Sequence, residues 1–149
     1  LDHYVELVKR LPVGTPSSAR INSWFGVRRS PFGEGMKLHE GLDFDLDHGD
    51  PILSTGDGIV SRVEWDRRYG LMVDIAHNSR ITTRYAHLSK ALVSEGQRIC
   101  RGHILGLGGS TGRSTGPHLH YEVLVDNEAR NPYQFVQLAG QLNRVFHRG

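Results

Sequence analysis

Between about residue 20 and residue 125 the chain alternates short apolar or β-branched runs with glycine-rich turns, and this pattern constrains the fold most. Glycine makes up 18 of the 149 residues, and each one inside a helix costs about 1 kcal/mol relative to alanine. Closely spaced strands with few helical stretches between them predict a mainly β fold, a small antiparallel sheet or sandwich. The candidate strands are 20–26, 41–46, 58–65, 71–77, 81–87, 103–107 and 118–125.

Both ends of the chain have the pattern of short helices. Residues 1–11 place apolar side chains at helical spacing until Pro12 interrupts them, and residues 132–146 follow Asn131, a residue suited to capping a helix. Residues 12–19 are rich in proline, glycine and serine, as loops are. We therefore predict that 1–19 is a linker or the tail of a preceding region, and that 20–149 is the folded domain. Because the first residue is Leu1, we expect a processed product or a fragment, with any signal peptide or anchor upstream.

Length and composition exclude several classes of protein. A chain of 149 residues suits one domain with a substantial core. The sequence contains no run of 18 apolar residues, so we predict no membrane span. The net charge of +2 is not concentrated in a dense basic tract, so no nucleic-acid partner is predicted. The single cysteine, Cys100, excludes an internal disulfide and a cysteine-rich zinc site, and we expect it to be a small buried hydrophobe.

Two of the nine histidines stand two residues apart in the sequence PHLHYEVLV. The alternation and β-branched content of this segment predict a strand, and in a strand residues i and i+2 point to the same face, about 7 Å apart. The imidazoles of His118 and His120 are therefore expected to converge on one side of the sheet. Leu119 and Tyr121 are expected to point to the other side.

A second group of potential metal ligands is His39 and Asp43, within the sequence HEGLD. Imidazole and carboxylate are both common zinc ligands. In a straight strand these two residues would lie about 13 Å apart, too far for one ion. We therefore predict a bend between them, and we assign it to Gly41, which has the conformational freedom to permit it.

His87 ends the candidate strand 81–87 beside a loop, a position that suits a cleft. A catalytic zinc site keeps three protein ligands and one open position, whereas a structural site is closed by four. His39, Asp43 and one of the pair His118 and His120 would supply three ligands. The other member of the pair and His87 would then lie beside the activated water, as general base and as hydrogen-bond donor in the transition state.

Residues 106–117, GLGGSTGRSTGP, resemble a phosphate-binding loop only superficially. The spacing of the glycines and the following strand match neither the P-loop nor the dinucleotide fingerprint, and no nucleophile-elbow motif is present. We interpret this segment as a flexible loop that carries the histidine pair to the cleft. Arg113 is a candidate partner for a substrate carboxylate, but we expect it to be solvated. Structural roles are expected for three further histidines: His48, His77 and His103.

The combined motifs resemble the lysostaphin-type (LytM) zinc metallopeptidases. The resemblance runs from about Ile21 to Phe135 and is carried by His-x-Gly-x-Asp at 39–43, Tyr-Ala-His at 85–87 and GSTGRSTGPHLHYEV at 109–123. It implies a small antiparallel β domain with an open substrate groove. It also implies one zinc ion held by His39, Asp43 and His120, with His87 and His118 as the catalytic histidines.

Members of this family are peptidoglycan endopeptidases, so the resemblance implies hydrolysis of peptide crosslinks in the bacterial cell wall. The sequence GRSTGPHLHYEV is more similar to that of members that cut D-alanyl–diaminopimelate bonds than to that of members that cut glycine bridges. We expect a periplasmic, cell-envelope or extracellular location. The alternative is a non-hydrolytic or autoinhibited module that binds cell wall or activates an amidase. An upstream segment or a separate protein would be its regulatory partner.

Overall fold

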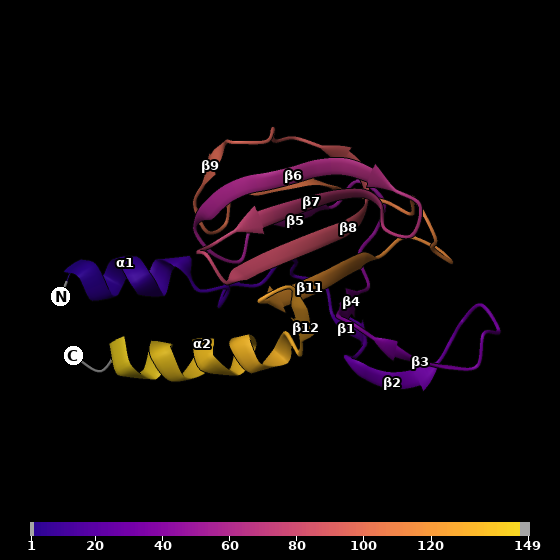
Figure 1. Cartoon of the computed structure of the whole chain (residues 1–149), viewed down its shortest axis with the longest axis horizontal. Helices are drawn as coiled ribbons and strands as arrows, with labels where there is room; N and C mark the ends of the chain where they lie inside the picture. The colour runs from indigo at the N-terminus through magenta and orange to yellow at the C-terminus, as the bar shows by residue number, and fades with distance from the viewer. Residues whose placement is uncertain (1, 147–149) are drawn as a thin grey trace.

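The computed structural model describes residues 2–146 and confirms the mainly β fold (Figure 1). Leu1 and residues 147–149, which fall at the ends of the predicted segments, lie outside the described residues. Helix α1 spans Asp2–Arg10 and helix α2 spans Tyr133–Phe146. Both extend from one end of the sheet in Figure 1, and no described helix has the length and apolar character needed to cross a membrane. The strands are β1 (Ile21–Ser23), β2 (Gly26–Arg29), β3 (Met36–His39), β4 (Leu42–Phe44), β5 (Pro51–Leu53), β6 (Gly58–Asp66), β7 (Gly70–Ala76), β8 (Ile81–Ala91), β9 (Arg98–Ile99), β10 (Ile104–Gly108), β11 (Leu119–Val125) and β12 (Glu128–Arg130).

Ten strands form one antiparallel sheet, with the central order β1-β4-β11-β8-β7-β6-β9. Strand β10 pairs with β5 and β8, and β12 pairs antiparallel with β11, whereas β2 and β3 form a separate hairpin. Each candidate strand from the sequence has a counterpart, but the segment 20–26 is broken. Strand β1 ends at Ser23, and β2 begins at Gly26, whose φ of 130° favours glycine. The strands that periodicity missed are short: β3, β5, β9 and β12.

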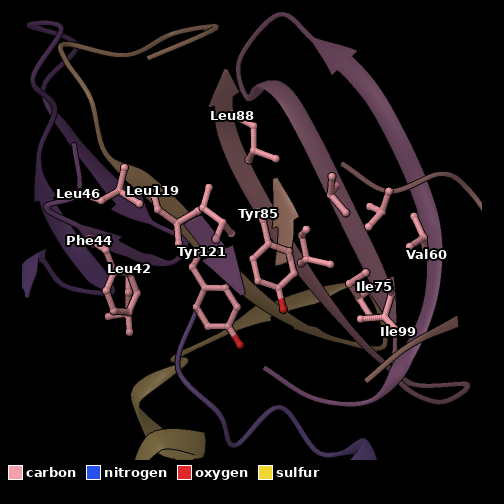
Figure 2. Packing of buried hydrophobic residues seen from close by; sticks show 14 of the residues in the cluster. Leu42, Phe44, Leu46, Val60, Ile75, Tyr85, Leu88, Ile99, Leu119 and Tyr121 are labelled. Atoms are coloured by element: carbon pink, nitrogen blue, oxygen red, sulfur yellow. The ribbon is translucent and has the colours of Figure 1, made fainter. Parts of the chain in front are cut away.

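The hydrophobic core combines side chains of the central strands, such as Leu42 of β4 and Tyr85 of β8, with side chains of β5, β9 and β10 (Figure 2). Leu42, Leu119 and Tyr121 are almost completely buried, and Tyr85 packs beside Tyr121 with ring centroids 5.3 Å apart. Thr55 hydrogen-bonds the hydroxyl groups of both tyrosines, so burial leaves neither hydroxyl unpaired. Leu119 and Tyr121 of β11 point into this core. Because side chains alternate along a strand, His120 between them points to the opposite face.

Cys100 is exposed, so the prediction that it is buried is wrong. It follows directly after β9, in which Ile99 points into the core with 3% of its surface exposed. Alternation therefore turns the next side chain toward solvent, into the turn that leads to β10.

Arg101 and Asp57 form hydrogen bonds with carbonyl oxygens at the carboxyl end of α1. The Arg101 guanidinium donates to the carbonyl oxygens of Val8 and Lys9, at 3.0 and 3.3 Å, and the Asp57 amide donates to Lys9 at 2.8 Å. A cation at this position also interacts favourably with the helix dipole. The assignment of 1–19 to a linker or preceding region stays a prediction.

Candidate metal centre and substrate cleft

The predicted bend between His39 and Asp43 is present, because the two residues lie on strands of different sheets. Glycine is required at position 41 for a different reason from the one we predicted. Its φ lies outside the left-handed region, but a Cβ at this position would come within 2.3 Å of the carbonyl oxygen of Tyr121. Glycine is required here because the backbone of β11 passes close by, not because the turn needs its conformational freedom.

His39, Asp43 and His120 converge in a buried cluster whose potential ligand atoms all lie within 4.8 Å of one another. His120 and Asp43 are directly paired in the register of β11 and β4. Asp43 Oδ1 lies 2.8 Å from His120 Nδ1 and 3.2 Å from His39 Nε2. Two imidazole nitrogens and one carboxylate oxygen form the donor set of a catalytic zinc site, so these residues fit that ion.

His87 lies within β8 rather than at its end, because the strand continues to Ala91. Tyr85 pairs with Val73 and Leu88 with Leu71, so two residues of β8 face a single residue of β7. At this bulge His87 has a φ of 66°, which is unusual for a residue with a side chain. The bulge turns the imidazole toward the cluster of His39, Asp43 and His120. Such backbone strain is typical of functional sites.

His118 joins the same cluster, with its Nε2 4.0 Å from Asp43 Oδ1. Its Nδ1 lies 2.8 Å from the carbonyl oxygen of Gly116, and the Nδ1 of His87 lies 2.6 Å from that of Thr111. Because a carbonyl oxygen only accepts hydrogen bonds, both Nδ1 atoms carry the proton. Each neutral ring therefore has an unprotonated Nε2. The structure brings together all five site residues predicted from the sequence.

The sequence predicts a flexible loop over residues 106–117, but 106–108 belong to β10. The first half of the remaining loop, 109–117, is held by hydrogen bonds. The Thr111 hydroxyl donates to the Leu88 carbonyl at 2.7 Å and accepts from the Leu71 amide at 3.1 Å. At the next residue, a Cβ on Gly112 would lie 2.2 Å from the backbone nitrogen of Gly70. This close approach holds the Thr111 carbonyl in place as the partner of His87.

Glu122 is a residue of the site that the sequence analysis missed. Its side chain is 1% exposed, and Oε1 lies 2.9 Å from His120 Nε2 and accepts a 2.8 Å hydrogen bond from the Tyr69 hydroxyl. Arg84 lies 3.7 Å from Oε2 and is itself paired with Asp74. A carboxylate on the second nitrogen of a metal-binding histidine orients the ring. The available signal was position, since Glu122 follows His120 by two residues on the same strand face.

The charges of the cluster shift several pKa values. Burial alone raises the pKa of Asp43, but the hydrogen bonds and charges of His120 and His39 outweigh it and hold this pKa well below its usual range. Burial lowers the pKa of His120, but Asp43 and Glu122 overcome that effect and raise it to about 9. Burial lowers the pKa of His87 to about 4, so this ring is neutral at pH 7. A metal ion bound at this cluster would replace the proton shared by His120 and Asp43.

The cluster lies at the floor of a cleft of about 760 Å³, between the β2–β3 hairpin and the loop 109–117. Arg113 is exposed, as predicted, but its guanidinium also has partners. It pairs with Glu34 of the hairpin and lies over the ring of Phe32, at 4.3 Å from the ring centroid. Glu34 also pairs with Lys37. These contacts join the two walls of the cleft.

Comparisons with known proteins agree with this geometry. The model of peptidase family M23 matches residues 37–132. The chain is 45% identical over 118 residues to the peptidoglycan DD-endopeptidase ShyA of Vibrio cholerae, covering 78% of this chain and 27% of that protein. A crystal structure of a zinc-containing peptidase from Vibrio cholerae superimposes with a TM-score of 0.74 at 43% identity, covering 79% of this chain and 38% of the other.

The catalytic domain of lysostaphin from Staphylococcus simulans also has the same fold, with a TM-score of 0.74 at 29% identity, covering 80% of this chain and 92% of that domain. The chain spans about a quarter of the length of the curated relatives it matches. The family match includes all five residues of the cluster and the bulge that carries His87. The chain belongs to peptidase family M23.

Proposed function

We propose that this chain is a zinc metalloendopeptidase domain that hydrolyses peptide crosslinks of peptidoglycan. The observation that carries the proposal is the convergence of His39, Asp43 and His120 within 4.8 Å, beside His87 and His118 at the floor of a cleft. The name of the Vibrio cholerae relative, a peptidoglycan DD-endopeptidase, supports the substrate class.

In this proposal His39, Asp43 and His120 are the metal ligands. Zinc in such a site supplies a Lewis acid that activates water and polarises a peptide carbonyl. His118 and His87 handle the protons, because their Nδ1 atoms are held by carbonyl oxygens and their Nε2 atoms are left to the reacting groups. One ring would accept a proton from the attacking water, and its protonated form would donate a hydrogen bond to the carbonyl oxygen that gains charge. The same proton would then pass to the amide nitrogen as the C–N bond breaks.

The D-alanyl–diaminopimelate crosslink is the bond we propose as substrate. The sequence of the loop and β11 supports it, and so does the word DD-endopeptidase in the names of relatives. Such a substrate places the protein in the bacterial cell envelope, and we propose the periplasm as the compartment. A regulatory segment or protein stays a prediction.

A non-hydrolytic cell-wall-binding or amidase-activating module is the alternative. A module that had lost activity would not need the complete set of five histidine and aspartate side chains, nor the strained backbone of His87. Completeness of the cluster therefore favours hydrolysis.

Digestion of purified sacculi tests the proposal. Sacculi crosslinked through diaminopimelate and sacculi crosslinked through glycine bridges are incubated separately with the zinc-loaded protein, and the soluble products are identified by mass spectrometry. When the digested sacculi are then treated with a muramidase, we expect crosslinked dimeric muropeptides to be converted to monomers in the first kind only, and no conversion with His118→Ala. Binding to sacculi without any cleavage product would contradict the proposal and favour the alternative.

A further inference from the structure

Four basic side chains line the cleft, and three of them are paired with acidic residues outside the metal cluster. Arg68 lies 3.3 Å from Glu40, and both Lys37 and Arg113 pair with Glu34. The fourth, Arg28, differs in its partner, because its acidic contact is Asp43 of the metal cluster. Arg28 is therefore the cation that a negatively charged substrate group would meet beside the reacting bond.

The geometry of Arg28 leaves its guanidinium available. Strand β2 pairs Arg28 with Lys37 of β3, and both line the cleft. The closest guanidinium nitrogen lies 3.9 Å from Asp43 Oδ2, longer than a hydrogen bond. The histidines contact the other oxygen of the carboxylate, Oδ1. With the Asp43 charge committed to a metal ion, no group among the described residues holds the donors of Arg28 in a hydrogen bond. Its side chain lines the cleft and is 38% exposed.

The chemistry of the proposed substrate fits this position. In a D-alanyl–diaminopimelate crosslink, the carbon bonded to the scissile nitrogen also carries a free carboxylate. A glycine bridge has no acid there. The scissile bond must lie against the metal cluster, and the Arg28 guanidinium lies within 4 Å of that cluster. Arginine binds a carboxylate through two parallel hydrogen bonds, which gives both orientation and strength.

We infer that Arg28 is a specificity-determining residue that binds the carboxylate next to the scissile amide. The inference rests on the proposed function, because it identifies which feature of the crosslink the endopeptidase recognises. Binding of this carboxylate by Arg28 would also explain a preference for diaminopimelate crosslinks over glycine bridges. The metal ligands and the two catalytic histidines act only on the peptide bond, which both substrates share.

Two soluble substrates test the inference. One is a crosslinked muropeptide dimer with the free carboxylate beside the scissile amide, and the other is the same dimer with that carboxylate converted to a carboxamide. A charge-assisted pair of hydrogen bonds predicts that amidation lowers the kcat/KM of the wild-type protein about ten- to hundred-fold. Arg28→Gln should lower kcat/KM on the acid by a similar factor and remove the discrimination between the two dimers.

Arg29→Gln is the matched control, because Arg29 is the next residue of β2 and its side chain lies on the opposite face of the strand, in solvent. This variant should keep the wild-type ratio between the two substrates. Zinc content and direct binding of both dimers to His118→Ala, with and without Arg28→Gln, give readouts that do not need turnover. In the binding experiment, Arg28→Gln should weaken only the dimer with the carboxylate.

Two results would overturn the inference. If the wild-type protein cleaves both dimers equally well, the carboxylate is not recognised. If Arg28→Gln lowers both rates by the same factor, or empties the zinc site, Arg28 acts by positioning Asp43. Failure of the proposed function would look different, because the wild-type protein would then release no product from either dimer.

Discussion

His87 and His118 lie with their ring centroids 4.7 Å apart, and both are held through Nδ1 by carbonyl oxygens of the same loop. Thr111 holds the first ring and Gly116 holds the second. The loop therefore sets the tautomer of both rings, and the metal cluster faces their Nε2 atoms. This arrangement separates the two rings to which we assign proton transfer from the three side chains that we propose as metal ligands.

Removal of single side chains should separate ligands from catalytic residues. Asp43→Ala and His120→Ala should lose the bound zinc, because each removes one of three donors. His87→Ala and His118→Ala should keep nearly one zinc per chain and lose a factor of roughly 10² to 10⁴ in kcat. Elemental analysis and rates on a soluble crosslinked muropeptide measure both effects. A His118→Ala protein without zinc, beside a His120→Ala protein that retains it, would reverse the assignment of the pair.

Glu122→Gln should weaken zinc binding by about ten- to hundred-fold. It removes the negative charge of the carboxylate whose oxygen accepts a hydrogen bond from the His120 ring. The amide retains an acceptor oxygen, so the fold should persist. Competition with a chromophoric chelator measures the affinity. Glu64→Gln, a half-exposed carboxylate on β6, is the control and should bind zinc like the wild-type protein. Equal affinities of the two variants would show that Glu122 does not support the metal site.

Glu34→Gln should increase cleavage of intact sacculi by roughly two- to five-fold. Glu34 pairs with Arg113 across the cleft, and we expect an extended peptide to enter more readily when this contact between the hairpin and the loop is absent. An ion pair at this exposure contributes at most about 1 kcal/mol, which sets the size of the effect. The rate at which dimeric muropeptides disappear from sacculi, measured after muramidase digestion, gives the size of the effect. Glu128→Gln breaks an exposed pair on β12 instead, and it should change nothing. A slower Glu34→Gln protein would indicate that the bridge shapes the bound state.

Stability should fall between pH 6.5 and pH 4, partly because of His77. Burial lowers the pKa of His77 to about 4, and its Nδ1 donates a 2.7 Å hydrogen bond to the Asp57 carbonyl. The unfolded chain binds a proton near pH 6.5 while the folded chain stays neutral, so the contribution of His77 is present above pH 6.5 and is lost as the pH falls toward 4.

Urea unfolding of wild-type and His77→Gln proteins at pH 7 and pH 4.5 measures this dependence. The wild-type protein should lose about 2–3 kcal/mol more than the variant between the two pH values. His103→Gln changes an exposed histidine and should follow the wild-type protein. The same pH dependence in His77→Gln and wild-type proteins would contradict the burial of a neutral His77.

Strand faces and helix ends that depend on neighbouring residues could be predicted from the sequence. Alternation along residues 118–125 places His118 and His120 on one face, and the structure pairs His120 with Asp43. Asn131 caps helix α2 as expected, with its Oδ1 accepting from the Tyr133 amide. These features depend on neighbours within a few residues, so propensity and spacing are sufficient to identify them.

The choice between His118 and His120 as metal ligand came from family resemblance, because strand geometry places both rings on the same face. Only the tertiary structure decided the features that depend on contacts between distant segments. The bulge at His87 follows from the register of β8 against β7, and Gly41 is required by the passage of β11. The positions of Glu122 beside Tyr69, and of Arg28 beside Asp43, depend on how separate strands pack. A sequence pattern shows which face a side chain occupies, but long-range packing determines which groups it meets there.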